Sequence, residues 1–383
     1  MITLVKDTIN KKDIDNLIEW LKTYPRLTKG PVTHKLEEKW SNIIGSKYSV
    51  FCNSGSSANL LMLHTLLETN RIKRGSKVIV PALAWATDLS PVMQLGLDPL
   101  ICDINLEDLS VDLDHLESLM KKDSPKALML VSVLGLVPDM DKIVMLCKKY
   151  NVILLEDACE SMGSKFRGQN LGTFGLMSSF STYFGHHIST IEGGFISTDD
   201  FEIYEVLKAV RSHGWDRDLE VETQKKLREE WETSNFNALY TFYYSGLNLR
   251  STDLQAYIGL SQVDRLAAVS DIRNYNFNMY NKLIENDYWK VSSRDDCFIS
   301  NFAYPVIHPN RNQMVKCLID NNVEVRPLIC GSMTSQPFYT KRYGRKNMKN
   351  CSIVDKYGFY LPNHPSMKKK DIELISAIIN KNL

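Results

Sequence analysis

Three polar segments in the first half of the chain carry the side chains best suited to chemistry, and each follows a short apolar run. The first is the turn 53–59, Asn-Ser-Gly-Ser-Ser-Ala-Asn, which precedes a helical pattern. The free backbone N–H groups and positive dipole end of a helix N-terminus attract phosphate. Serine and asparagine are also good helix caps, so this turn alone leaves both interpretations open.

The second segment is 156–158, Glu-Asp-Ala, at the end of the most apolar run of the chain. Open α/β sheets bind their ligands at the C-terminal ends of the strands. A carboxylate there, such as Asp157, can pair with a protonated pyridine nitrogen and keep that ring electron-withdrawing. It can equally cap a helix or bind a metal. Trp85, after another apolar run, could lay its indole on an aromatic ring, although a buried structural tryptophan is the commoner case.

The third segment, 179–194, contains His186-His187 and ends in Glu192-Gly193-Gly194. An imidazole exchanges protons near neutral pH, because its unperturbed pKa is about 6.5. Neighbouring histidines point in different directions, so only one of the pair is expected to serve as a base. We assign that role to His186, for a reason that depends on the family resemblance described below.

The elements that must position these segments alternate between helix and strand along residues 10–200. The spacing of the apolar residues predicts amphipathic helices, as at 14–21 and 36–44. Short apolar runs typical of buried strands lie at 49–52, 77–80, 100–103, 127–133 and 152–155. Helices between such strands favour parallel pairing through right-handed crossovers. The pattern therefore predicts an α/β sheet with helices on both faces.

Beyond Asp253 the pattern changes to one long helical stretch that runs toward Ile284. It is followed by β-rich segments near 298–306 and 323–326 and by helical segments near 313–320 and 370–379. We predict a large α/β domain of residues 1–250 and a smaller C-terminal α+β domain of residues 251–383.

Composition excludes several function classes. The 46 basic and 45 acidic residues nearly cancel, so no bulk attraction to nucleic acid or an anionic membrane is expected. No apolar run is long enough for a signal peptide or a spanning helix, which favours a cytoplasmic location. The eight cysteines contain no Cys-x-x-Cys pair, which argues against a zinc site or a disulfide framework.

Taken together, the three segments resemble the StrS/DegT-type sugar aminotransferases, in which a lysine stands six residues before Glu-Gly-Gly. Counting back from Glu192 places His186 at that lysine position. The likeness extends to 30–31, 246–250, 252–256 and 326–327. The resemblance implies the aspartate-aminotransferase-like pyridoxal-phosphate (PLP) fold, fold type I, with a large mixed-sheet α/β domain.

The resemblance also implies a role for each matching residue. Asp157 would bind the pyridine nitrogen, Trp85 would stack on the ring and Glu160 would lie near the ring hydroxyl. The cofactor-binding set is Ser56, Ser57, Trp85, Asp157, Glu160, Ser181 and Asn248, and the substrate-binding set is His213, Arg250 and Arg326. Asn248 and Arg250 would serve the neighbouring subunit's site, which implies a homodimer with shared active sites.

Replacement of the lysine by His186 bears on the activity, because lysine binds PLP covalently and suits transamination. Histidine offers only proton transfer. In this respect the chain is similar to the sugar 3-dehydratases of the family, above all those acting on GDP-4-keto-6-deoxymannose. The implied reaction uses L-glutamate to form pyridoxamine phosphate (PMP). His186 then removes a proton at C4′, and the C3 hydroxyl of a GDP-linked 4-keto-6-deoxy hexose or heptose leaves, as in lipopolysaccharide or capsule biosynthesis.

Three alternatives stay open on the sequence. An iron–sulfur CDP-sugar 3-dehydrase needs clustered cysteine ligands, whereas those of the C-terminal half, Cys297, Cys317, Cys330 and Cys351, are dispersed. An ordinary sugar aminotransferase needs an amine, and no lysine lies nearer the site motif than Lys165. A non-catalytic regulator that lost its lysine by decay should also have lost other cofactor contacts, which are retained.

Overall fold

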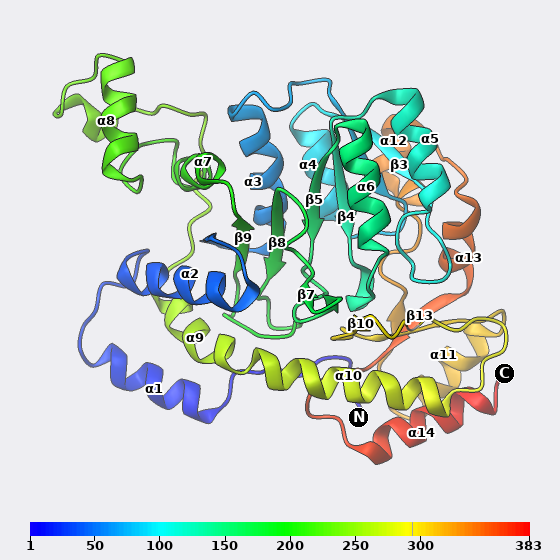
Figure 1. The fold of residues 1–383 in the computed structure, drawn as a ribbon. Helices are drawn as coiled ribbons and strands as arrows, with labels where there is room; N and C mark the ends of the chain where they lie inside the picture. The colour runs from blue at the N-terminus through cyan, green and yellow to red at the C-terminus, as the bar shows by residue number, and fades with distance from the viewer. Residues whose placement is uncertain (293) are drawn as a thin grey trace.

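A seven-stranded mixed sheet forms the centre of the molecule in the computed structural model, which describes residues 1–292 and 294–383 (Figure 1). The strand order is β1-β9-β8-β5-β4-β2-β3. The strands are β1 (Tyr48–Cys52), β2 (Lys77–Pro81), β3 (Asp98–Cys102), β4 (Ala127–Val131), β5 (Ile153–Asp157), β8 (Met177–Ser181) and β9 (Gly194–Thr198). Strand β9 is antiparallel to both of its neighbours, and the strands from β8 to β3 are parallel. The predicted fold class is confirmed.

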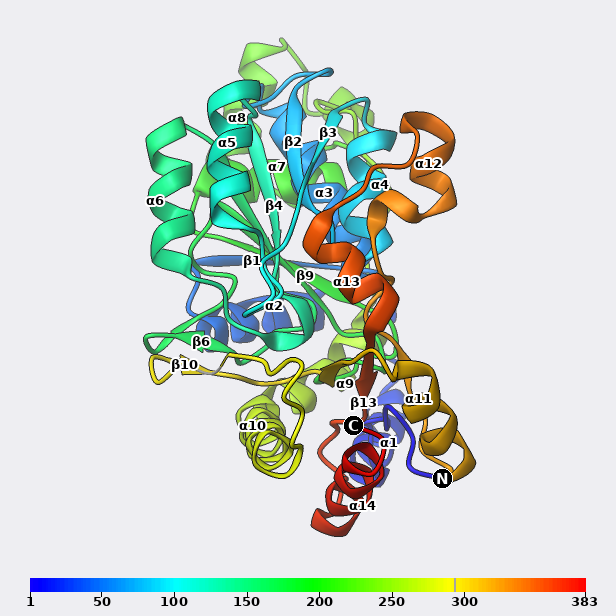
Figure 2. The same ribbon diagram turned by 90° about the vertical axis from the view of Figure 1, so that its right-hand side faces the viewer.

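Helices cover both faces of this sheet, as predicted. They are α2 (Pro31–Ile44), α3 (Gly55–Glu68), α4 (Ala86–Gln94), α5 (Leu113–Asp123), α6 (Met140–Tyr150) and α7 (Phe201–Arg211). Figure 2 shows α5 and α6 on one side of the sheet and α4 on the other. Side chains at the N-caps of α3, α5, α6 and α7 accept a hydrogen bond from the third residue of the helix, which explains where these helices begin.

The central strands are buried along their whole length, because both faces of the sheet are covered. Every residue of β4 and β8 is buried. Continuous burial explains why β4, Ala-Leu-Met-Leu-Val, is an unbroken apolar run and shows no alternation of apolar and polar residues. Strand β8, Met-Ser-Ser-Phe-Ser, is equally buried but contains three serines. The three polar segments singled out in the sequence lie at or directly after the C-terminal ends of β1, β5 and β8.

A second, smaller assembly lies beside one end of the central sheet. It contains the antiparallel sheet β11-β13-β12 with α9, α10, α11 and α14. The bounds are β11 (Tyr304–Ile307), β12 (Arg326–Pro327), β13 (Gly358–Leu361), α9 (Asp253–Asp264), α10 (Leu266–Leu283), α11 (Arg311–Asp320) and α14 (Lys369–Asn380). The long helical stretch predicted from 254 toward 284 is found as two helices, α9 and α10, which Arg265 separates.

The remaining elements connect or extend these assemblies. They are α1 (Lys11–Leu21), α8 (Val221–Glu230), α12 (Pro337–Tyr343), α13 (Lys349–Tyr357), the small sheet β10-β6-β7 (Cys297–Phe298, Lys165–Phe166, Gln169–Asn170) and 3-10 turns at Val133–Gly135, Asn237–Tyr240 and Met333–Ser335. Helix α8 stands on an arm away from the body of the molecule (Figure 1). None of the helices in the described part of the chain has the length and apolarity needed to cross a bilayer.

Residues of the predicted large domain contact residues of the predicted C-terminal domain at two places. The N-terminal residue Ile2 pairs with Val323, which lies just before β12 of the sheet β11-β13-β12. Helix α13 lies at the β3 edge of the central sheet, where the backbone N–H of Asn350 donates to Asp103 over 2.9 Å. The division at residue 250 stays a prediction, and both chain ends contribute to the surroundings of the site.

Candidate active site

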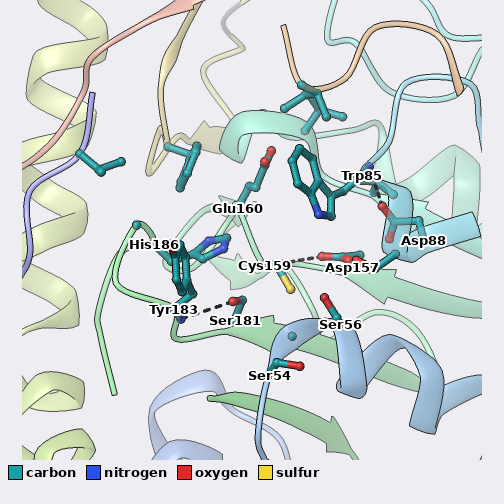
Figure 3. A pocket seen from close by; sticks show the side chains of 18 of the residues that line it. Ser54, Ser56, Trp85, Asp88, Asp157, Cys159, Glu160, Ser181, Tyr183 and His186 are labelled. Carbon is teal, nitrogen blue, oxygen red and sulfur yellow. Dashed lines mark hydrogen bonds between the residues drawn. The ribbon is translucent and has the colours of Figure 1, made fainter. Parts of the chain in front are cut away.

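A cavity of about 460 Å³ opens at the C-terminal ends of the parallel strands, where the family resemblance places the cofactor (Figure 3). Its lining includes most of the predicted site: Ser56, Trp85, Asp157, Glu160, Ser181 and His186. Strand order brings these segments together, because β5 and β8 are neighbours and β4 separates β5 from β2. The ends of parallel strands meet at one edge of the sheet, so residues distant in sequence share one cavity.

The hydroxyl-rich end of the cavity is built by the start of α3 and the end of β8. Gly55 is required there, because a Cβ at this position would lie 2.6 Å from the Cβ of Ser181. Ser54 and Ser56 line the cavity, whereas Ser57 does not. The Ser57 hydroxyl accepts a hydrogen bond from the hydroxyl of Ser54 over 3.0 Å. The prediction of Ser57 as a phosphate ligand therefore gains no support from its position.

Asp157 is held rigidly at the end of β5, with 6% of its surface exposed. Its Oδ1 accepts the backbone N–H of Cys159 over 2.8 Å, and its Oδ2 accepts the Asn59 side-chain amide over 2.6 Å. Ser179 donates in turn to Asn59. No lysine, arginine or histidine forms an ion pair with Asp157 among the residues that the structure describes. Its carboxylate is available to a cationic ligand group in the cavity.

Trp85 and Glu160 form another part of the cavity wall (Figure 3). The Trp85 indole is 55% exposed and offers an apolar face to a planar ring. Glu160 is half-buried, and its Oε2 accepts the backbone N–H of Leu134 over 2.8 Å. Burial raises the pKa of Glu160 to about 7, so near neutral pH a large share of this carboxyl group is protonated and can donate a hydrogen bond.

The two adjacent histidines have different surroundings. His187 is fully buried, lies outside the cavity lining, and its Nε2 lies 2.9 Å from the carbonyl oxygen of Ser300. His186 lines the cavity, with its ring 5.3 Å from that of Phe302. Burial lowers the pKa of His186 to about 4, so its imidazole is neutral at physiological pH. Position and charge state both favour His186 as the base, which stays a prediction.

Besides Ser57, four predicted residues lie outside the cavity of their own chain. Asn248, Arg250 and His213 form a separate group, in which Arg250 Nε donates to Asn248 Oδ1 over 3.0 Å and lies near His213. Arg326 is exposed and pairs with Glu324. Arg326 is opposite Tyr360 in the β12–β13 register, and Tyr360 does line the cavity. Arg326 therefore lies near the rim.

Several residues of the cavity wall were missed by reasoning from the sequence. They are Leu4, Val5, Ser54, Asp88, Cys159, Tyr183, Phe302, Ile329 and Tyr360. Ser54 and Tyr183 lie within segments already recognised, and Cys159 directly follows one, so their neighbours were the available signal. Leu4 and Val5 come from the N-terminus and Phe302, Ile329 and Tyr360 from the C-terminal third, and no local pattern marks them as site residues.

The mixed sheet, with a buried carboxylate and a serine-rich helix start at its strand ends, defines a PLP-dependent enzyme of the aminotransferase fold. The chain belongs to the DegT/DnrJ/EryC1/StrS aminotransferase family, whose model matches residues 7–380. This confirms the family that the sequence motifs indicated.

Two relatives in this family and one solved structure carry the same enzyme name. GDP-4-keto-6-deoxy-D-mannose 3-dehydratase of Yersinia pseudotuberculosis is 32% identical over 99% of this chain and 98% of its own length. The enzyme of the same name from Escherichia coli O55:H7 is 33% identical over 92% of both chains. A crystal structure of GDP-4-keto-6-deoxymannose-3-dehydratase with a trapped PLP–glutamate geminal diamine has a TM-score of 0.90 and 30% identity, over 99% of this chain and 100% of that one.

Proposed function

We propose that this protein is a PLP-dependent 3-dehydratase that removes the C3 hydroxyl group of a GDP-linked 4-keto-6-deoxy sugar, with L-glutamate as the amino donor. One observation carries the proposal: the cavity contains His186 at the lysine position, and none of its lining residues in the described chain is a lysine. Two relatives, which cover 99% and 92% of the chain, are named for this dehydration. The assay described below distinguishes a hexose substrate from a heptose substrate.

The residues of the cavity fit PLP chemically. Asp157, which forms no ion pair within the described part of the chain, offers its carboxylate to a protonated pyridine nitrogen, and Trp85 offers an apolar face to the ring. The helix start at Ser54 and Ser56, together with Ser181, offers hydroxyl and backbone donors to a phosphate. When bound, the cofactor supplies a conjugated ring that accepts electrons from the reacting carbon atoms.

The protein's own groups then orient the reactants and move protons. Asp157 keeps the pyridine nitrogen protonated, and Glu160 donates a hydrogen bond toward the ring hydroxyl in its neutral form. His186 takes the proton at C4′, since its low pKa keeps it in the neutral, proton-accepting form. Overall, glutamate and the sugar give 2-oxoglutarate, ammonia and the 3-deoxy-4-keto sugar, with glutamate as the reductant.

Incubation with PLP, L-glutamate and a panel of nucleotide-linked 4-keto-6-deoxy sugars tests the proposed function. We expect a GDP-linked product lacking one oxygen atom by mass spectrometry, with ammonia and 2-oxoglutarate formed in equal amounts. The panel should include mannose- and heptose-type sugars and both GDP- and CDP-linked forms. A 4-amino sugar as the main product would identify an aminotransferase, and turnover that requires iron would identify the iron–sulfur class.

We also propose a homodimer in which each active site receives Asn248 and Arg250 from the partner subunit. Both side chains lie away from the cavity of their own chain, and Asn248 is exposed. The neighbouring arm exposes large apolar side chains, including Phe236 (81% exposed) and Tyr240 (76% exposed). Exposed apolar groups of this size on one arm are typical of a surface that a partner covers.

Mixed dimers test this sharing directly. Asn248→Ala should weaken PMP binding by about tenfold, the usual cost of one hydrogen bond to a charged group. Asp157→Asn chains should be nearly inactive. When the two variants are mixed and allowed to exchange subunits, each heterodimer contains one site with neither lesion and one with both. At a PMP concentration that leaves Asn248→Ala mostly empty, activity should rise to about a quarter of wild type, as random pairing of two chains predicts.

The control mixes wild type with Asp157→Asn, which should give half of the wild-type activity whether or not sites are shared. If the two variants exchange subunits and activity does not rise above that of the unmixed parents, each site is built from one chain.

A further inference from the structure

Asp88 is a buried carboxyl group beside the cofactor site that the proposed mechanism does not use. It lies in the first turn of α4 and has no exposed surface. Its Oδ2 accepts the backbone N–H of Trp85 over 2.9 Å, and its Oδ1 accepts the Asn59 side-chain amide over 3.1 Å. The same Asn59 nitrogen donates to Asp157. Asp88 thus contacts Trp85 directly and shares the Asn59 amide with Asp157, and these are the two residues expected to hold the pyridine ring (Figure 3).

The surroundings of Asp88 contain acids and no compensating cation. The ionisable groups that face it are the carboxyl groups of Asp157 and Glu160 and the thiols of Cys159 and Cys330. Among the residues that the structure describes, no basic side chain is paired with Asp88. Two buried carboxylates that share one amide donor repel each other strongly, so one of the pair retains its proton.

Of the two carboxyl groups, Asp88 is the one expected to retain its proton, and Asp157 is the one expected to be ionised. Asp157 accepts two N–H groups and faces the cavity, where the cofactor's pyridinium would stabilise its negative charge further. Asp88 is completely buried and has no such partner. Burial, and then the charge of Asp157, raise the pKa of Asp88 well above its usual range.

We propose that Asp88 is a positioning residue that remains protonated in the holoenzyme and, with Asn59, orients the Asp157 carboxylate toward the pyridine nitrogen while fixing the backbone of Trp85. The inference rests on the proposed function only in that PLP is the ligand of this cavity. A neutral carboxyl group can donate to Asp157 and accept from Trp85 at the same time, which a carboxylate cannot do. Ionised Asp88 would instead repel Asp157.

Two substitutions at Asp88 distinguish a protonated Asp88 carboxyl group from an ionised one. Asparagine is neutral and can also donate to Asp157 while accepting from Trp85, so Asp88→Asn should change PLP affinity by less than about threefold. Alanine can do neither, so Asp88→Ala should weaken PLP binding by about tenfold or more, the usual effect of losing hydrogen bonds to a charged group. The pH at which the absorbance of bound PLP changes should also shift in Asp88→Ala and stay near wild type in Asp88→Asn.

Infrared difference spectra of wild type minus Asp88→Asn, both with PLP bound, test the proton itself. A carboxylic-acid C=O band should appear on the wild-type side, whereas the band of the partly protonated Glu160, which both proteins share, cancels. PLP affinity and infrared spectra need no sugar substrate, so this inference can fail while the dehydratase assay succeeds, and the reverse. Absence of the band, together with equal loss of PLP affinity in both variants, would show that Asp88 is ionised. Unchanged PLP affinity in Asp88→Ala would show that it positions nothing.

Asp13 provides the matched control. It occupies the same third position of a capping box, in α1, and is also buried, but it pairs with Arg265 over 2.6 Å. Asp13→Ala and Asp13→Asn should both lower the temperature of thermal unfolding and leave PLP affinity unchanged. If Asp88→Ala is too unstable to purify, Asp88→Ser, which can still accept from a nearby backbone N–H but cannot reach Asp157, replaces it in the same comparison.

Discussion

His186→Lys should convert the protein into one that binds PLP covalently, and its dehydration rate should fall by about 10³-fold, the usual contribution of a well-placed general base. His186 already lines the cavity, so a lysine there reaches the same region with a flexible amine. Burial disfavours the charged form of that amine as it does for the imidazole, which leaves part of the lysine neutral and nucleophilic.

Dehydration should suffer for a second reason besides the lost imidazole. After C4′ is deprotonated, a lysine amine can return a proton to C4 of the sugar or displace the sugar's nitrogen from the cofactor. Both routes compete with departure of the C3 hydroxyl group. The ratio of 3-deoxy to 4-amino product should therefore fall along with the rate.

Absorbance and mass spectrometry measure this result. The variant as purified with PLP should absorb at longer wavelength than PMP, and borohydride should leave a phosphopyridoxyl group on residue 186. Wild type treated in the same way should show unmodified protein, because the cavity offers no amine. His186→Asn is the matched control, since it removes the base without adding an amine: it should lose dehydration and gain no adduct. If His186→Lys carries no adduct and dehydrates at the wild-type rate, residue 186 is neither at the lysine position nor the base.

Asp157→Asn should lower turnover by about 10²–10³-fold, the usual cost of removing a group that stabilises charge developing during the reaction, while weakening PLP binding much less. An asparagine cannot keep the pyridine nitrogen protonated, so the ring loses most of its capacity to accept electrons. The hydroxyl-rich end of the cavity, lined by Ser54, Ser56 and Ser181 and proposed to hold the phosphate, is not altered by this change.

Steady-state kinetics and PLP titration separate the two effects of Asp157→Asn. Glu156→Gln serves as the control, because Glu156 precedes Asp157 but accepts the backbone N–H groups of Gly172, Phe174 and Gly175 on the far side of the strand. It should lower stability and leave the spectrum of bound PLP unchanged. Near-normal turnover by Asp157→Asn would remove Asp157 from its proposed role.

The sequence predicted the five strands β1 to β5 of the seven-stranded sheet, because their buried residues form short apolar runs. Strands β8 and β9 were not predicted, because serine and threonine interrupt their apolar residues. The strand predicted at 127–133 is found at 127–131, and the long helix from 254 is found to be divided at Arg265. Little in the local sequence predicts that division, because it depends on the backbone of a single residue between α9 and α10. Side-chain periodicity reports which face is buried and not where a helix bends.

The sequence by itself determined which chemical groups the site contains. They are a carboxylate at a strand end, a serine-rich helix start, and an imidazole six residues before Glu192 in place of an amine. These follow from chain order and spacing, which any fold of this family must preserve. They were sufficient to indicate the family, the cofactor and the absence of a covalent anchor.

Only the tertiary structure decided which groups meet and how they are charged. It placed Asp88 beside Asp157, a pair separated by more than sixty positions in the chain, and it left Ser57, Asn248 and Arg250 outside the cavity. It also lowered the pKa of His186 from the value of a free imidazole to about 4. The physical reason is the same in each case: contacts across the sheet and loss of water around a charge arise from packing between distant segments, and neither is encoded in the spacing of neighbouring residues.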